Sequence, residues 1–271
     1  MSEMTDRPKM QQLGELDPNA TIWRYLTFQK FVSLIATGAL WFSKLQVFED
    51  AFEGTIPEPA RRGQEVLNRS MEDWFQDDEV KRQIRRFTEE NEENGREMIV
   101  ASCWFISKHE SVKMWGEYAI DDEGVVIKST IGDLAQSLAL SHDQWWIGKV
   151  SYIDFTQHDS MDVYQGSQAH LRASLKSKEY TDESELRVAT VNWVTLGCLN
   201  PDGSPPDEKQ RAGFVYSEGR SGIFVKANLP VMIGELRTAP GATDWHRSRV
   251  DLLRSTAGIR VPVSSSALSM P

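Results

Sequence analysis

The chain has 271 residues, of which 40% are hydrophobic and 26% charged, so it can form a core and lies outside the disordered class. Its formal net charge of −10 argues against a broad nucleic-acid surface that neutralises phosphates. The two cysteines, Cys103 and Cys198, lack CxxC spacing and are typical of reduced thiols. The longest nearly apolar stretch, 31–42, is too short to span a bilayer. We therefore expect a cytoplasmic protein without a membrane partner.

Residues 1–20 are polar and show no sustained period, so we expect a mobile N-terminal arm followed by a single domain over 21–271. Within that domain, Thr27 is a suitable cap for a helix whose apolar residues recur at helical spacing. Gly38 suits the left-handed residue that ends this helix. A short strand is expected next, at 41–43.

The composition changes sharply between residues 58 and 96, where Trp74 and a few other apolar residues stand among many charges. This pattern predicts an inserted segment of one or two charged amphipathic helices. Helices of this kind most often form a solvated cover over the core, and the alternative is a surface that binds a partner.

Strands and helices alternate along the rest of the chain without a regular βαβ order. This pattern predicts an α+β fold with mixed, partly antiparallel sheets and flanking helices. The nearly continuous apolar run at 98–105 is typical of a central strand covered on both faces, and Ser111 can cap a short helix after it. Further strands are expected at 124–129, 146–153, 213–217, 222–227, 232–238 and 258–263, further helices at 131–140, 160–175 and 243–256, and a surface loop at 197–213.

One predicted strand carries most of the chemistry and begins at Glu183, in the sequence ESELRVATVNW. The two-residue period of a strand places Glu183, Glu185 and Arg187 on one face, with the two carboxylates about 7 Å apart. Such a pair either lies in solvent, where Arg187 neutralises one acid, or converges on a polar ligand in a cleft. On this pattern alone, the solvated arrangement is favoured.

Two other groups of residues are candidates for a site. Asp50 and Glu53 stand among aromatic residues in FEDAFEG, and we expect them to accept backbone N–H bonds and to shape a turn. Trp115 and Tyr118 form an aromatic pair that either packs into the core, the favoured arrangement, or stacks on a flat ring. No metal site is predicted, because the five histidines lack metal-ligand spacing and HExxH does not occur.

Several motifs occur in order: WRYLT (23–27), LWFSKLQVFEDAFEG (40–54), CWFIS (103–107), MWGEYA (114–119), GVVI (124–127), KEYTDESELRV (178–188), GELRTAPGA (234–242) and GIRVPVSSS (258–266). Their order and spacing resemble a bacterial family catalogued as domain of unknown function 2971, from about residue 22 onward. The chain departs from the family pattern at Glu49, Ala51 and Trp104. The resemblance implies kinship of fold, because the family's function is not established.

A second resemblance carries chemical content. The opening RYLT strand, the helix after it and the late ExE strand are similar to the order of elements in ADP-ribosyltransferases. This similarity implies that Glu185 holds the ribose 2′-OH of NAD and stabilises the ribosyl cation, while Glu183 orients the acceptor. It also implies that Arg24 contacts the diphosphate or the adenosine ribose, and that the rings are sandwiched by Tyr25, Trp115 and Tyr118.

The leading functional prediction is an NAD-consuming ADP-ribosyltransferase of the kind used in toxins or phage defence. Its partners are a nucleotide-type small molecule, with NAD as substrate, and an unidentified macromolecular acceptor. This prediction requires that Arg24 and Glu185 face one cavity with an aromatic residue between them.

Two alternatives stay open. One is a Mg²⁺-dependent nuclease or phosphoesterase, against which the net charge of −10 argues. In it the metal is gathered by carboxylates while Lys178 holds a phosphate, and the carboxylates are those of Asp50, Glu53, Glu183 and Glu185. The other is a non-catalytic binding module that uses the helices at 58–96, and it is favoured if the carboxylates lie in open solvent.

Overall fold

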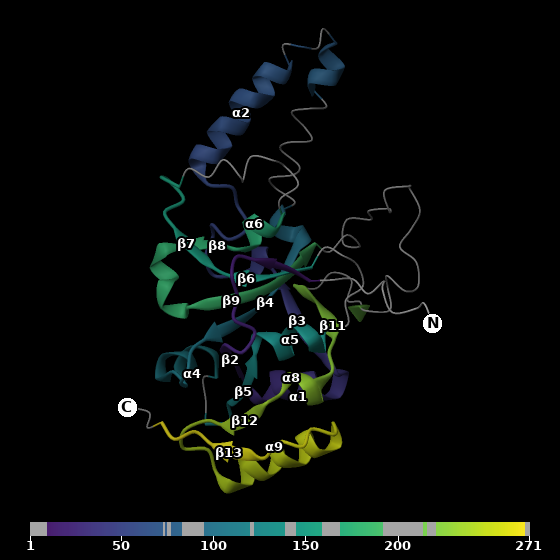
Figure 1. The fold of residues 1–271 in the computed structure, drawn as a ribbon, viewed down its shortest axis with the longest axis vertical. Helices are drawn as coiled ribbons and strands as arrows, with labels where there is room; N and C mark the ends of the chain where they lie inside the picture. The colour runs from purple at the N-terminus through teal and green to yellow at the C-terminus, as the bar shows by residue number, and fades with distance from the viewer. Residues whose placement is uncertain are drawn as a thin grey trace.

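The computed structural model describes residues 10–72, 74, 77–82, 95–119, 122–138, 145–158, 169–191, 214–215 and 221–268. They form one eleven-stranded mixed sheet, a separate pair of short strands and a set of helices that flank the sheet (Figure 1). The predicted α+β class, with mixed, partly antiparallel strands and flanking helices, is confirmed.

The main path of the sheet runs through β1 (Gln11–Leu13), β6 (Trp145–Lys149), β9 (Glu185–Val191), β4 (Ile99–Ile106), β2 (Thr21–Leu26), β5 (Val125–Thr130), β12 (Glu235–Thr238) and β13 (Val263–Ser265). A branch leaves β4 through β3 (Ala39–Lys44), β11 (Gly222–Lys226) and β10 (Phe214–Val215). The separate parallel pair consists of β7 (Ser151–Ile153) and β8 (Leu175–Ser177).

The helices are α1 (Phe28–Thr37), α2 (Glu58–Glu72), α4 (Val112–Tyr118), α5 (Ile131–Ser137), α6 (Ala169–Ala173), α8 (Leu229–Met232) and α9 (Asp244–Thr256), with the 3₁₀ helices η1 (Leu45–Val47) and η3 (Lys178–Glu183). The predicted caps are confirmed: Thr27 accepts the N–H of Lys30, and Gly38 ends α1 with φ 58°. Ser111 caps α4 in the same way, by accepting the N–H of Met114. Within the described ranges, no helix combines the length and apolarity needed to cross a membrane.

The main core lies between one face of the sheet and helices α1, α5, α8 and α9. On β9, Leu186 and Val188 point into this core, so the alternation of a strand turns Glu185 and Arg187 to the opposite face. That opposite face carries two smaller apolar clusters, one beneath α4 and one beneath η1 and α6. The charged residues of β9 are therefore buried on the face that α6 covers.

The sheet divides at β4, and this division positions the site. One edge of β4 pairs with β9 almost throughout. On the other edge, the first part of β4 pairs with β3 at Val100 and Ala101, whereas the last part pairs with β2 at Phe105 and Ile106. Among the described strands, none pairs with residues 102–104 on this edge. We call the resulting opening between β2 and β3 the fork.

Two predicted boundaries are wrong. The mobile arm predicted over 1–20 includes β1, which pairs with β6 because Gly148 lets Leu13 approach closely, so the chain is part of the sheet from about residue 11. Residues 1–9 lie outside the described residues. The helix predicted over 160–175 ends at Ala173, since Leu175 already pairs with β7.

Other predictions are met in part or lie outside the described residues. The insertion predicted over 58–96 begins with α2, which projects from the sheet in Figure 1, and residues 83–94 are not among those described. The strand predicted over 146–153 is two strands, β6 and β7, and the last strand lies at 263–265. The loop predicted over 197–213 lies outside the described residues.

Candidate functional site

A cavity of about 670 Å³ opens in the fork, which is within the usual range of about 300–1,000 Å³ for small-molecule sites. Residues of β2, α1, β3, β4, η1, α4, η3 and β9 line it. Arg24 and Glu185 both belong to this lining, and so does the aromatic side chain of Tyr118. Arg24 and Glu185 therefore share one cavity, which is the first requirement of the transferase prediction, and an aromatic residue belongs to the same lining.

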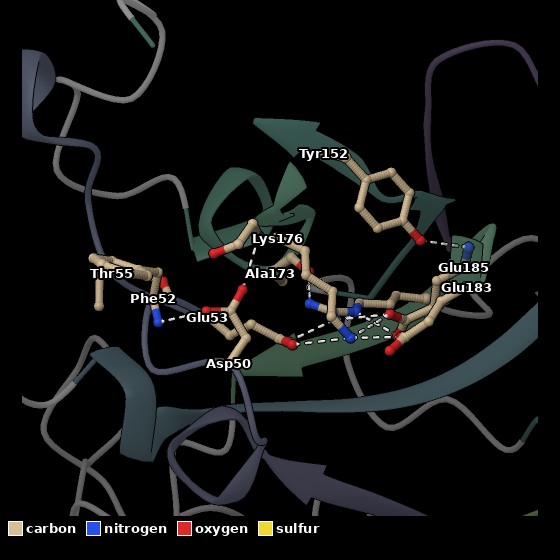
Figure 2. A network of polar contacts seen from close by, with 11 residues as sticks. Asp50, Phe52, Glu53, Thr55, Tyr152, Ala173, Lys176, Glu183 and Glu185 are labelled. Carbon is tan, nitrogen blue, oxygen red and sulfur yellow. Dashed lines mark hydrogen bonds and ion pairs between the residues drawn. The ribbon is translucent and has the colours of Figure 1, made fainter. Parts of the chain in front are cut away.

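Glu185 is held by two cations at one end of the cavity (Figure 2). Arg187 makes a bidentate pair with it, with Nε 2.7 Å from Oε1 and Nη2 3.0 Å from Oε2. Lys176 of β8 places its Nζ 3.4 Å from the same Oε2. All three side chains are buried. Both carboxylate oxygens of Glu185 are therefore engaged by cations of the protein.

Backbone contacts hold this pair at its place in the fold. The hydroxyl of Tyr152 accepts the backbone N–H of Glu185 at 2.9 Å (Figure 2). Arg187 also donates from Nη1 to the carbonyl of Ala173 in α6, at 3.0 Å. Because β7 and α6 both contribute, the start of β9 is fixed from two sides.

Glu183 also pairs with Lys176, but it does not lie on the face of a strand as predicted. Its Oε2 lies 2.6 Å from Nζ of Lys176. The strand predicted from Glu183 begins only at Glu185, because Glu183 ends η3 and Ser184 adopts a left-handed φ of 40° that breaks the alternation. The two acids therefore converge through Lys176 instead of sharing a strand face. Among the described residues, Lys176 is the one cation that pairs with Glu183, and it does so at one oxygen.

Glu53 is a third carboxylate of this group, which the sequence analysis placed in a turn. It is fully buried, with Oε1 3.2 Å from Nζ of Lys176 and Oε2 2.5 Å from Nη2 of Arg187. The predicted turn role is confirmed for Asp50, which accepts the N–H of Phe52 and of Ser177. For Glu53 it is wrong, because this side chain forms ion pairs.

We call the five residues Glu53, Glu183, Glu185, Lys176 and Arg187 the carboxylate end of the cavity. Three carboxylates against two cations leave one negative charge if all are ionised. Burial raises the pKa of Glu53 and of Glu183, although both acids have cationic neighbours. Burial also disfavours the charge of Glu185, but Arg187 and Lys176 outweigh it and lower its pKa to about 2. Glu185 is therefore the firmly ionised member of the group.

The predicted ring-binding residues lie in different places. Tyr118 lines the cavity and its side chain is exposed in part, while burial raises its pKa. Tyr25 also lines the cavity, although its hydroxyl is used to accept the N–H of Ser111 at 2.8 Å. Trp115 is 1% exposed and does not line the cavity, because it faces the sheet and donates from Nε1 to Glu110. The stacking role predicted for Trp115 is therefore wrong.

Other aromatic residues also line the cavity, none of them identified as a site residue from the sequence, and three of them contact Lys176, Arg187 or Arg24. Each of these three lies at the distance typical of a cation–π contact. The pairs are Tyr180 with Lys176 at 4.7 Å, Phe48 with Arg187 at 5.3 Å, and Trp104 with Arg24 at 5.8 Å. A search of the sequence for aromatic residues near the acids could have found Tyr180 and Phe48, which lie close to Glu183 and Glu53 in the chain.

The structure does not favour the metal-dependent alternative. In the part of the chain that is described, no group of three or more His, Cys, Asp or Glu residues is arranged to hold a metal ion. The ammonium of Lys176 contacts all three carboxylates, so it lies where Mg²⁺ would have to bind. Lys178, predicted to hold a phosphate in that alternative, pairs at the surface with Asp154. The binding-module alternative is not favoured either, because it was to gain support if the carboxylates lay in open solvent, and they do not.

No family model and no curated protein matches this chain. The resemblances to domain of unknown function 2971 and to ADP-ribosyltransferases therefore stay predictions.

Proposed function

We propose that the cavity binds NAD or a closely related nucleotide and that the chain is an NAD-consuming ADP-ribosyltransferase. The observation that supports this most is that Arg24, Tyr118 and the carboxylates of Glu183 and Glu185 line one cavity. They come from β2, α4, η3 and β9, which are brought together because β2 and β3 separate at the fork.

The charge of the carboxylate end suits the reaction. When the bond between ribose C1′ and the nicotinamide nitrogen breaks, its electron pair leaves with nicotinamide and C1′ develops positive charge. Water or an acceptor nucleophile then attacks C1′ and loses its proton. One carboxylate in excess over the cations stabilises that positive charge, which is greatest in the transition state.

The two glutamates have different parts in this proposal. Glu185 is saturated by Arg187 and Lys176, so it provides fixed negative charge and holds Lys176 in place. Glu183 has one carboxylate oxygen that pairs with no cation of the described residues, so we assign it the contact with the ribose. This assignment gives Glu183 the ribose contact that the resemblance to ADP-ribosyltransferases implied for Glu185.

The aromatic walls supply the remaining contacts. Tyr118 and Tyr180 flank the carboxylate end and offer faces on which a cationic nicotinamide ring can stack. An enzyme of this kind depletes cellular NAD, and on that ground we propose a toxin or phage-defence setting for it.

The test is nicotinamide release from NAD, which needs no knowledge of the acceptor because water can take its place. We expect release by the wild-type chain and a loss of about 100-fold or more in Glu183→Gln, since the amide carries no negative charge. Glu179→Gln is the matched control, because Glu179 is exposed in the same 3₁₀ helix, and it should keep the wild-type rate.

Glu185→Gln should also lower release, and its thermal unfolding must be recorded because Arg187 and Lys176 lose a partner. Undetectable release from the wild-type chain over a range of pH and NAD concentrations would contradict the proposal. Equal release by wild type and a folded Glu183→Gln would remove Glu183 from the reaction.

A further inference from the structure

Arg24 lies in the fork, beside the part of β4 that has no strand partner on that edge among the described residues. Its Nη1 donates to Oγ of Ser102 at 3.0 Å and to the carbonyl of Cys103. These bonds give one carbonyl of β4 a partner and hold the guanidinium at the cavity wall. Its Nε is buried and has no hydrogen-bond partner. One side of the guanidinium is thus anchored while a donor on the other side is unsatisfied.

Lys30 lines the same wall from α1. The side chain is exposed in part, and partial burial at the wall lowers its pKa, which the charge of the Arg24 guanidinium lowers further. Burial also lowers the pKa of Arg24. Within the described ranges, neither side chain forms an ion pair with a carboxylate. Lys176, which lines the same cavity, and Arg187, which does not, each contact at least two.

Neighbouring like charges in a partly buried site cost free energy unless an anion lies between them. The planar fork of an arginine suits two phosphate oxygens, and a lysine adds a point charge at the rim. We propose that Lys30 joins Arg24 in an anion subsite that binds a phosphate group of the ligand. The inference also names the substrate class, and in this it rests on the proposed function. The substrate is then a nucleoside phosphate, and a nucleoside without a phosphate group is a poor substrate.

The subsite can be tested without any reaction, by calorimetric titration of the full chain with inorganic pyrophosphate. We expect saturable binding that weakens as salt is added. Arg24→Met and Lys30→Met should each weaken it by about tenfold or more, the usual effect of losing one charge-assisted hydrogen bond. Lys149→Met is the control, because Lys149 is exposed on β6 and does not line the cavity.

Lys30→Met keeps the test decisive if Arg24→Met does not fold, because Lys30 is exposed on α1. Binding that Lys30→Met weakens, with no nicotinamide release by the wild type, leaves the subsite standing and removes the proposed function. Glu183-dependent release of nicotinamide, with pyrophosphate binding absent or equal in wild type and Lys30→Met, overturns the subsite and leaves the proposed function.

Discussion

The carboxylate end and the anion subsite differ in how their charges are compensated. At the carboxylate end, Lys176 contacts three acids and Arg187 contacts two, so the charges are compensated largely within the protein. At the anion subsite, Arg24 and Lys30 have no carboxylate partner among the described residues, and Arg24 keeps an unsatisfied donor. The difference indicates that the carboxylate end stabilises the fold, whereas the anion subsite is completed by a ligand.

The largest expected effect is the loss of Lys176. Lys176→Met leaves three carboxylates, two of them buried, with one cation, and breaking a buried ion pair in this way typically lowers the free energy of unfolding by about 3–5 kcal/mol. Lys178→Met is the matched control two residues away, since Lys178 pairs with Asp154 at the surface and its loss should change the free energy of unfolding far less. Urea unfolding measures both. Similar losses in the two variants would show that the carboxylate end is no more structural than the surface.

Acid should weaken the carboxylate end in a defined pH window. The pKa of Glu185 is lowered from 4.5 to about 2 by Arg187 and Lys176, which outweigh its burial. A carboxylate with a lower pKa in the folded state stabilises the fold above its unfolded pKa, and this contribution is lost as pH falls from about 4.5 to about 2. The raised pKa values of Glu53 and Glu183 act with the opposite sign, because their ionisation disfavours folding as pH rises.

Comparison with Glu185→Gln isolates the contribution of this one residue. The difference in free energy of unfolding between wild type and variant should shrink by about 3 kcal/mol between pH 4.5 and pH 2, as a shift of this size implies. Urea midpoints at a series of pH values measure it. A difference that stays constant with pH would mean that Glu185 is not held ionised by its neighbours.

The parts of the fold that could be predicted from the sequence are those that a short, continuous stretch of residues determines. The continuous apolar run at 98–105 predicted the central strand β4, and Ser111 and Thr27 predicted two helix starts that the structure confirms. These features depend on a few adjacent residues. The three-residue strand β1 could not be predicted, because its place depends on the close approach that Gly148 of β6 allows.

The candidate site could be predicted only in part, because contacts between elements far apart in the chain leave no local pattern in the sequence. Arg24 and Glu185 lie on long strands, and both line the cavity as expected. Lys176 was not predicted as a site residue, and Glu53 was predicted to shape a turn or to bind Mg²⁺. Their ion pair joins elements far apart in the chain, so no local pattern predicted it. The turn at Ser184 has a positive φ that a serine seldom adopts, so no residue type marked the break before β9.

Among these predictions, the loss of Arg24 should change stability least. It is also the sharpest test of the difference between the carboxylate end and the anion subsite. Arg24→Met removes two hydrogen bonds, to Ser102 and to the carbonyl of Cys103, but it also removes a partly buried cation without a carboxylate partner among the described residues. These effects oppose each other, so we expect a loss of about 1 kcal/mol or less in urea unfolding without ligand.

Pyrophosphate should then separate Arg24→Met from the wild type. At about 100 times the dissociation constant, a ligand that binds only the folded state adds about 2.7 kcal/mol to the wild type, and the variant should gain less. A ligand-free loss as large as that of Lys176→Met would instead make Arg24 a structural residue. Both ends of the cavity would then serve the fold, because the anchoring bonds of Arg24 at the edge of β4 would outweigh the cost of burying its charge.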